Sequence, residues 1–272
     1  MNTEEFIGST DHVLSIRQNV TRLDNEAVVI PKDFSVVDLE KFLPYPRRVR
    51  REVRLLNMKD LLQFIDEELA SRHFVPVWFV NAGAVSCVMN YEDLSPDAPH
   101  GWGDSRAYFE IVRTREWLDW RENSGAYMSQ EVFCDFIEDH METIYEPSGA
   151  DLLEMCRNFR KITRVEYSSS FRASDGLIGL SYKESDQGAT KDMVIPDAIK
   201  IRVPIVLGAE DDTTYDIKAR VRVRIDKETH KLRMCYDMVR PEVPDRNALR
   251  DLETMVRTAR PGDRVYCGKL EK

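Results

Sequence analysis

Residues 215–225 read Tyr-Asp-Ile-Lys-Ala-Arg-Val-Arg-Val-Arg-Ile, and this stretch sets the fold class of the second half of the chain. Its basic residues alternate with apolar ones over eight positions. Side chains of a β-strand point alternately to its two faces, so this period of two predicts a strand with an apolar face and a cationic face. The cationic face carries Lys218, Arg220, Arg222 and Arg224.

Further strands are predicted on both sides of this stretch. Ser174-Asp175-Gly176 separates two apolar runs, 165–167 and 177–182, and is a strong signal for a β-hairpin turn. Other predicted strands cover residues 193–195, 199–207 and 231–239. Asp245 is expected to cap a last helix that buries leucines and a valine.

The first half of the chain alternates between strands and helices. Asn57, Ser129 and Ser148 each precede a run of apolar residues at helical spacing, so we expect each of them to cap a helix. A β-hairpin is predicted for residues 76–91, and Trp117 and Trp120 are expected on a short helix.

Along the chain the predicted elements are first mixed, then mostly helices, then mostly strands, and finally one helix. Because helices and strands are grouped in this way and do not alternate regularly, the sequence favours an α+β fold. We expect mixed and antiparallel sheets with a central helical segment and a C-terminal helix. Three regions are predicted: an N-terminal arm at residues 1–27, a mixed α/β region with helices at 28–161, and a mostly antiparallel β region closed by a helix at 162–272. The last two regions could equally form one continuous domain.

Composition describes an acidic globular protein. Of 272 residues, 39 are Lys or Arg and 48 are Asp or Glu, which gives a formal net charge of −9. The chain has no apolar run of the roughly 20 residues that a membrane span needs, so no membrane partner is expected. Its five cysteines are widely spaced and form no Cys-x-x-Cys pair, which predicts free thiols in a reducing cytoplasm and no zinc site. An acidic balance argues against general coating of nucleic acid but not against a local basic groove.

A second cationic run lies at residues 47–54, where five of eight residues are arginines. On a strand, Arg48, Arg50 and Arg54 would share the face opposite Val53. Guanidinium groups suit phosphate and carboxylate recognition because they offer planar, forked donors. We therefore interpret these arginines as a solvated face paired with acidic neighbours, a nucleic-acid contact or a subunit contact. For Arg220, Arg222 and Arg224 the alternatives are acidic residues opposite the row or a polyanion, because like charges repel.

One weak pattern suggests chemistry. Asp197 after a proline, followed by Asp216 and Lys218, resembles the core of restriction-type nucleases, in which two carboxylates hold Mg²⁺ and a lysine polarises water. A turn between two strands explains Pro196-Asp197 equally well.

Other catalytic signatures are missing from the sequence. It contains no phosphate-binding loop, nucleophile elbow or zinc-protease motif, so neither a cofactor nor a metal is predicted. Trp102 lies in the loop Gly101-Trp102-Gly103-Asp104. Its ring either packs over the domain or, if exposed, stacks on a base or fills a pocket of a partner.

Several stretches together carry a family resemblance. They are residues 29–34 (Val-Ile-Pro-Lys-Asp-Phe), 116–120 (Glu-Trp-Leu-Asp-Trp), 128–140, 146–155 and 236–241 (Tyr-Asp-Met-Val-Arg-Pro). Over roughly residues 28–260 the chain resembles the YfdQ-like family of phage and prophage proteins. The resemblance implies a phage or prophage origin and a bacterial host cytoplasm, and it implies no chemistry.

The sequence thus favours a non-enzymatic phage accessory protein that acts by binding and self-assembly. A homo-oligomer is expected, with a ring or a closed shell among the arrangements. One alternative is a recombination or nucleic-acid-processing protein that uses Asp197, Asp216 and Lys218. Another is an inhibitor of a host defence protein. Nucleic acid and a host protein are accordingly the other partners considered.

Overall fold

In the computed structural model the chain divides into two compact units, residues 1–49 and residues 50–272. In the first unit β1 (Thr21–Leu23) and β2 (Ala27–Val29) pair antiparallel. Most of the arm predicted at residues 1–27 lies outside the described residues, and the boundaries predicted at 28 and 162 stay predictions. The structure describes residues 21–23, 27–29, 44, 50–70, 74–94, 101–161, 165–172, 176–184, 190–209, 213–229 and 231–270.

The second unit begins with a five-stranded mixed sheet in the order β15-β4-β5-β6-β3. Strands β4, β5 and β6 pair antiparallel, whereas β15 pairs parallel with β4, and β3 pairs parallel with β6. The strands are β3 (Arg51–Leu55), β4 (Phe74–Val80), β5 (Ala84–Asp93), β6 (Ser105–Glu110) and β15 (Arg264–Cys267). The hairpin predicted around Asn81-Ala82-Gly83 is the β4–β5 pair.

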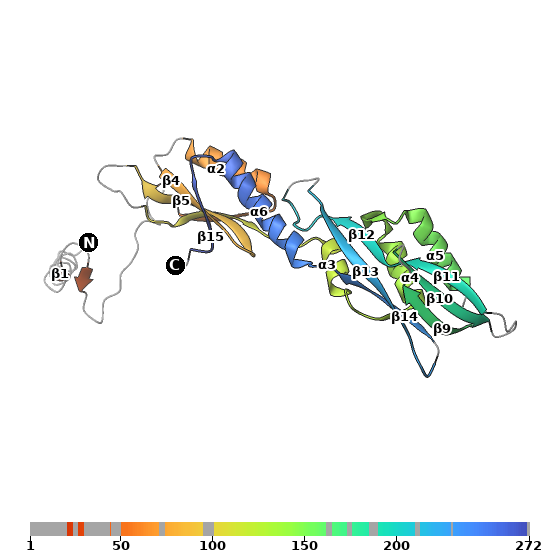
Figure 1. Ribbon diagram of the computed structural model, residues 1–272. Coiled ribbons are helices and arrows are strands. Elements are labelled where there is room, and N and C mark those ends of the chain that lie inside the picture. Colours follow the sequence, from red (N-terminus) through yellow and green to blue (C-terminus); the bar gives the residue numbers. More distant parts are fainter. Residues whose placement is uncertain are drawn as a thin grey trace, which may run out of the picture. The chain divides into compact units, whose positions relative to one another are not determined.

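Two helices cover one face of this sheet, α2 (Met58–Leu69) and α6 (Glu242–Ala259), which lie side by side (Figure 1). Asn57 caps α2 as predicted, since its side-chain oxygen accepts a hydrogen bond from the Asp60 N–H at 2.7 Å. Beneath the helices lie the fully buried side chains of Trp78, Cys87 and Phe109. Alternation along the strands therefore turns Arg106 and Tyr108 to the opposite face.

A second five-stranded sheet has the order β7-β14-β13-β12-β8, and all of its strands pair antiparallel. The strands are β7 (Met128–Ser129), β8 (Ile144–Glu146), β12 (Ala198–Val203), β13 (Tyr215–Ile225) and β14 (Leu232–Met238). Ile201, Ala219 and Met234 belong to its buried face. The other face is exposed and includes the alternating cations of β13.

The central helical segment predicted from the sequence is present. It consists of α3 (Arg115–Glu122), α4 (Gln130–Asp139), the short 3₁₀ helix η2 (Met141–Thr143) and α5 (Gly149–Lys161). Helices α4 and α5 contact each other, and α4 also contacts β14 of the second sheet (Figure 1). Ser129 and Ser148 both accept helix N–H groups, which confirms their predicted capping roles. In the described part of the chain, no helix is both long and apolar enough to span a membrane.

A third, antiparallel sheet has the order β11-β10-β9. Its strands are β9 (Val165–Arg172), β10 (Leu177–Glu184) and β11 (Thr190–Pro196). The β9–β10 pair is the hairpin predicted around residues 174–176, and Gly176 has a φ of +82°, which the turn requires. The elements together confirm an α+β fold with mixed and antiparallel sheets.

Two features of the C-terminal end differ from prediction. Helix α6 begins at Glu242, with Pro241 before it, so Asp245 lies inside the helix and is not its cap. Its carboxylate instead forms ion pairs with Arg113 and Arg121. After α6 the chain forms β15 and joins the first sheet, an additional strand that the sequence did not predict.

Candidate functional site

The exposed side of the second sheet carries a basic face. Five arginines and two lysines of β12, β13 and β14 lie on it, with their side chains exposed or half-buried. These cations are Lys200, Arg202, Lys218, Arg220, Arg222, Arg224 and Arg233. Alternation predicted the four that belong to β13. Their apolar neighbours Ile217, Ala219 and Val221 are buried, as the pattern requires.

Like charges lie directly opposite each other at two positions of this face. The strand register places Lys200 across from Lys218, and Arg224 across from Arg233. Directly opposite residues of an antiparallel pair bring their Cβ atoms to within about 5 Å, and like charges there are destabilising. At three other positions the register sets a cation opposite a carboxylate: Lys200 opposite Glu146, Arg202 opposite Asp216 and Arg220 opposite Asp237. The like-charge pairs are therefore compensated only in part.

Three carboxylates neutralise part of the basic face. Asp216 accepts two hydrogen bonds from Arg202, at 2.6 and 3.1 Å, and Arg222 bonds Asp237 at 2.5 Å. The guanidinium of Arg202 lowers the pKa of the Asp216 carboxyl, and a hydrogen bond to Glu146 raises the pKa of Lys200. The remaining cations form no ion pair with any described residue; they are Lys218, Arg220, Arg224 and Arg233. Seven cations against three carboxylates leave the face with a net charge of +4, on a chain whose net charge is −9.

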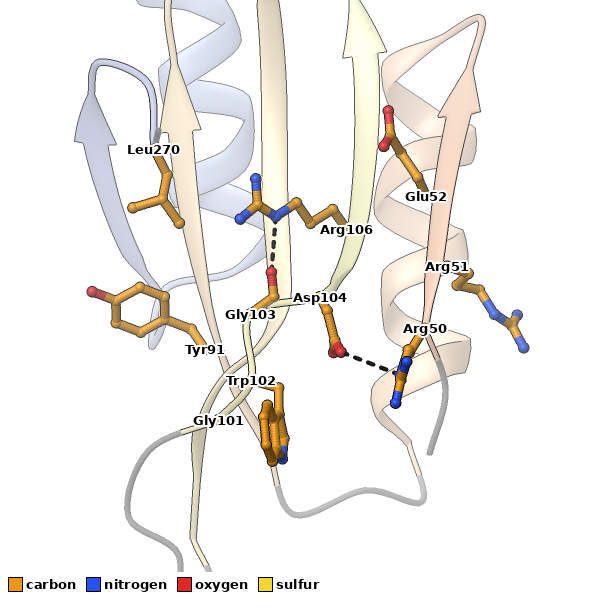
Figure 2. A pocket seen from close by; sticks show the side chains of 10 residues that line it. All are labelled: Arg50, Arg51, Glu52, Tyr91, Gly101, Trp102, Gly103, Asp104, Arg106 and Leu270. Atoms are coloured by element: carbon orange, nitrogen blue, oxygen red, sulfur yellow. Dashed lines mark hydrogen bonds and ion pairs between the residues drawn. The ribbon is translucent and has the colours of Figure 1, made fainter. Parts of the chain in front are cut away.

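The first sheet has a cleft on the face that α2 and α6 leave uncovered, and we call it the aromatic cleft (Figure 2). Its volume is about 780 Å³. The lining residues come from β3, β5, β6, the 101–104 loop and the C-terminal segment: Arg50, Arg51, Glu52, Tyr91, Gly101, Trp102, Gly103, Asp104, Arg106 and Leu270. A second hollow of about 640 Å³ shares Glu52, Arg106 and Leu270 with it, so the depression continues along β5 and β6.

Backbone contacts fix the position of Trp102 at this cleft. The Gly101 and Gly103 N–H groups donate to the Tyr91 and Asn90 carbonyls of β5, at 3.0 and 3.2 Å. A Cβ at position 101 would lie 1.9 Å from the Asn90 carbonyl oxygen, so only glycine allows the loop to lie this close to the strand. The side chain of Trp102, between the two glycines, is 74% exposed.

The two carboxylates of the aromatic cleft each contact an arginine, whereas one of its arginines, Arg106, forms no ion pair with a described residue. Asp104 is 3.7 Å from the Arg50 guanidinium and accepts a hydrogen bond from Asn90 at 2.8 Å. Glu52 bonds Arg54 at 2.9 Å. Arg106 donates its Nε–H to the Gly103 carbonyl at 2.8 Å and forms no ion pair with a described residue (Figure 2).

The arginines of the predicted 47–54 run take different positions. Arg50 lines the aromatic cleft, as does Trp102, so the structure brings two of the sequence candidates together. Arg54 is exposed and pairs with Glu52 and Glu110, which is the pairing with acidic neighbours that the sequence analysis considered. Arg51 is directed away from the cleft and bonds Glu68 at 2.9 Å. Arg48 lies outside the described residues.

The nuclease-like residues are not brought together. The Asp197 carbonyl accepts the Val221 N–H at 2.8 Å, so Asp197 lies beside Val221, five positions along β13 from Asp216. At about 3.4 Å per residue that separation is about 17 Å, whereas two ligands of one Mg²⁺ lie within about 4 Å of each other. Asp216 is bonded to Arg202 instead. Among the described residues no group of three or more His, Cys, Asp or Glu side chains could hold a metal ion.

Sequence reasoning missed several members of both surfaces. Lys200 and Arg202 alternate with buried Ile199, Ile201 and Val203, a signal that was available within a predicted strand. Arg106 likewise alternates with buried Ser105 and Ala107. No local sequence pattern predicts the register that places Lys200 opposite Lys218.

The fold and these surfaces define an α+β protein in which one sheet face is basic and another forms an aromatic cleft. A family model described as "Uncharacterized conserved protein (DUF2303)" matches residues 6–270, and the chain belongs to this family. Its match extends towards the N-terminus beyond the region of resemblance predicted from the sequence. Comparison with curated proteins and with solved structures gives no match.

Proposed function

We propose that this protein is a non-enzymatic binding protein whose basic face binds the phosphate backbone of nucleic acid. The observation that carries the proposal is the register of β12, β13 and β14, which sets Lys200 against Lys218 and Arg224 against Arg233. Such pairs weaken a sheet unless anions neutralise them. Glu146 already pairs with Lys200, and a bound polyanion would supply anions for Lys218, Arg224 and Arg233.

The charge of the basic face differs from that of the whole chain. The protein has 48 acidic residues, yet the strand residues of this face include only three. A local field of this kind determines where a charged ligand binds, even when the net charge of the protein has the opposite sign. A polyanion therefore has a defined place to bind on an acidic protein.

The type of cation favours phosphate over other anions. Five of the seven cations are arginines, whose planar forks match phosphate oxygens with two donors at once. Along β13 the cations follow at every second residue, so their Cα atoms are about 6.8 Å apart. This regular row suits a chain of repeated anions better than a single anionic group.

Fluorescence anisotropy of labelled DNA tests this function. We expect the double variant Lys218→Gln/Arg220→Gln to bind single-stranded and duplex DNA about 10-fold or more weakly than the wild type at moderate salt, because two phosphate contacts are lost. The matched control Lys59→Gln/Arg157→Gln removes two exposed cations from helices α2 and α5 and should bind as the wild type does.

Two results would contradict the proposal: equal weakening by both double variants, or no binding by the wild type at low salt. An acidic protein segment, including a second copy of this chain, is the other polyanion to consider. Native mass measurement with and without single-stranded DNA separates these ligands. Complexes that form without DNA and disappear in Lys218→Gln/Arg220→Gln would assign the basic face to a protein partner and overturn the proposal.

We also propose the finer assignment and context that the resemblance implies: a YfdQ-like phage or prophage accessory protein in the cytoplasm of a bacterial host, assembled as a homo-oligomer. The run from residue 116 to residue 155 supports the assignment. The same native mass measurement tests self-association. A ring or a closed shell gives one discrete multiple of the 31.6 kDa chain, and a monomer at high concentration contradicts this part.

A further inference from the structure

The aromatic cleft is separate from the basic face, because its lining residues belong to the other five-stranded sheet. Its volume of about 780 Å³ lies within the range of roughly 300–1,000 Å³ found for small-molecule sites. Its lining has two aromatic and five charged residues of both signs, whereas the basic face consists mostly of cations. The two surfaces therefore fit different parts of a ligand or different ligands.

We propose that the aromatic cleft is a second binding site, which takes one nucleotide unit with its base against Trp102 and its phosphate at Arg106.

The base contact follows from the position of the Trp102 ring. Figure 2 shows the ring on the side of Gly103 away from Arg106, towards Asp104 and Arg50. At 74% exposure it presents a large aromatic surface to solvent, although the other three tryptophans, Trp78, Trp117 and Trp120, are fully buried. The two glycine-anchored contacts to β5 fix the segment that carries the ring. Such a platform binds bases by stacking, largely regardless of base identity.

The phosphate contact follows from the charges around Arg106. Both carboxylates that line the cleft have arginine partners, Asp104 with Arg50 and Glu52 with Arg54. Arg106 is half-buried, and its Nε–H is directed to the Gly103 carbonyl, which fixes the plane of the guanidinium (Figure 2). Its two terminal nitrogens have no partner among the described residues. A fixed guanidinium fork without a carboxylate suits a phosphate group.

Arg106 and Trp102 are also neighbours through the loop itself. The carbonyl that Arg106 bonds belongs to Gly103, the residue directly after Trp102. Figure 2 shows the Trp102 ring and the Arg106 guanidinium on opposite sides of Gly103, and both residues line the same cleft. A nucleotide unit that contacts both would therefore extend along the cleft past Gly103. The source of this unit is either a free mononucleotide or a nucleotide within an unpaired strand, and both have the same chemistry.

Tryptophan fluorescence of the full chain gives a direct test, since Trp102 is the exposed ring among the four tryptophans. We expect nucleoside monophosphates, or a short single-stranded oligonucleotide, to quench the emission to a saturating level. The corresponding nucleosides, which lack phosphate, should bind about 10-fold or more weakly. Quenching by monophosphates identifies the free nucleotide as a ligand, and quenching by the oligonucleotide alone identifies the unpaired strand.

Variants assign the contacts. Calorimetry should show binding about 10-fold or more weaker for Trp102→Ala and restored in Trp102→Phe, because a phenyl ring still stacks. Arg106→Gln should weaken binding of the phosphate-bearing ligand but not of the nucleoside. The basic-face variant Lys218→Gln/Arg220→Gln is the matched control and should bind monophosphates as the wild type does.

The proposal is overturned if neither ligand quenches wild-type emission in a saturable way. It is also overturned if Trp102→Ala and Arg106→Gln bind as tightly as the wild type, or if the basic-face variant loses monophosphate binding. Because Lys218→Gln/Arg220→Gln leaves the cleft intact, the proposal for the basic face and the proposal for the cleft can be refuted separately. Loss of DNA binding without loss of monophosphate binding would concern the basic face alone.

Discussion

Gly101 illustrates how single residues position the candidate sites. Its N–H donates to the Tyr91 carbonyl, and any Cβ would overlap the Asn90 carbonyl carbon and oxygen, at 2.7 and 1.9 Å. Asn90 in turn holds both Asp104 and the Ser105 N–H with its side chain, at 2.8 and 2.9 Å. A short sequence of small and polar residues thereby fixes one side of the aromatic cleft.

The first prediction concerns this position. Gly101→Ala should lower the free energy of unfolding by about 1–3 kcal/mol, because the added methyl group forces the loop away from β5. The control is Gly262→Ala, where a Cβ meets nothing within 4 Å and the effect should stay within about 0.5 kcal/mol. Urea denaturation of both variants measures the difference. Equal stability of the two variants would show that the close approach at Gly101 is absent.

At the residue scale, local chemistry predicted a large part of the structure. Asn57, Ser129 and Ser148 cap their helices because an N-cap depends on a side chain and on N–H groups two or three residues away. Asp245 shows the limit of this reasoning. Its partners Arg113 and Arg121 are more than 120 positions away, and no local pattern distinguishes that role from capping.

Helix α6 connects distant elements of the second unit. It contacts β4 and β15 of the first sheet and β13 of the second sheet. Near its N-terminus Asp245 pairs with Arg113 at 3.1 Å and with Arg121 of helix α3. The Arg113 and Asp245 side chains are 21% and 16% exposed, so water solvates these charges only in part.

The second prediction tests this connection. Asp245→Asn should lower the free energy of unfolding by about 1–3 kcal/mol, since it leaves the mostly buried Arg113 without its carboxylate. Glu242→Gln, at the first position of the same helix, removes the same charge from an exposed side chain. Thermal and urea unfolding should show that Glu242→Gln lowers the free energy of unfolding by at most about 1 kcal/mol, because it removes a negative charge from the positive end of the helix dipole. A loss as large in Glu242→Gln would refute the role of the ion pairs.

At the element scale, strand partners were harder to predict than strands. Strand β13 was recognisable because its alternation extends over eleven residues. Strand β15 has only four residues, and its partner β4 begins at Phe74, in a distant part of the sequence. Neither the length of β15 nor the residues around it therefore predict this pairing. The parallel pair of β3 and β6 also depends on contacts between separate segments. Short strands take their structure from partners that a local pattern does not contain.

At the scale of the whole molecule, two buried phenols link stability to pH. Tyr167 and Tyr236 are almost fully buried, and burial raises the pKa of each phenol well above its usual value. Their hydroxyl groups bond Gln130 and the Trp120 carbonyl, at 3.1 and 2.9 Å. The native state therefore keeps both protons at a pH where the unfolded chain releases them.

The third prediction follows from the sign of these shifts. Below about pH 10 both states are protonated and the phenols add no pH dependence. Above that pH the unfolded state binds fewer protons, so the free energy of unfolding falls as pH rises, by up to about 1.4 kcal/mol per pH unit for each phenol. In urea denaturation, the free energy of unfolding of Tyr236→Phe should fall less steeply above about pH 10 than that of the wild type. An unchanged slope would contradict the burial of this phenol.

The two candidate surfaces differ in how far the sequence predicts them. The basic face is visible in part, because alternation alone puts four cations of β13 on one side. The aromatic cleft combines residues from β3, β5, β6, the 101–104 loop and Leu270, which come from distant parts of the chain. Arg50 and Trp102 were recognised one by one, but their proximity depends on the pairing of β3 with β6.

The salt dependence of DNA binding tests the central claim most directly. Four cations of the face form no ion pair with a described residue: Lys218, Arg220, Arg224 and Arg233. If each of them neutralises a phosphate, the logarithm of the single-stranded DNA affinity should fall with the logarithm of salt concentration with a slope of about −2.8. Lys218→Gln/Arg220→Gln should halve this slope to about −1.4, since each lost contact removes about 0.7. Identical slopes for the wild type and this variant, or binding that salt does not weaken, would contradict the account.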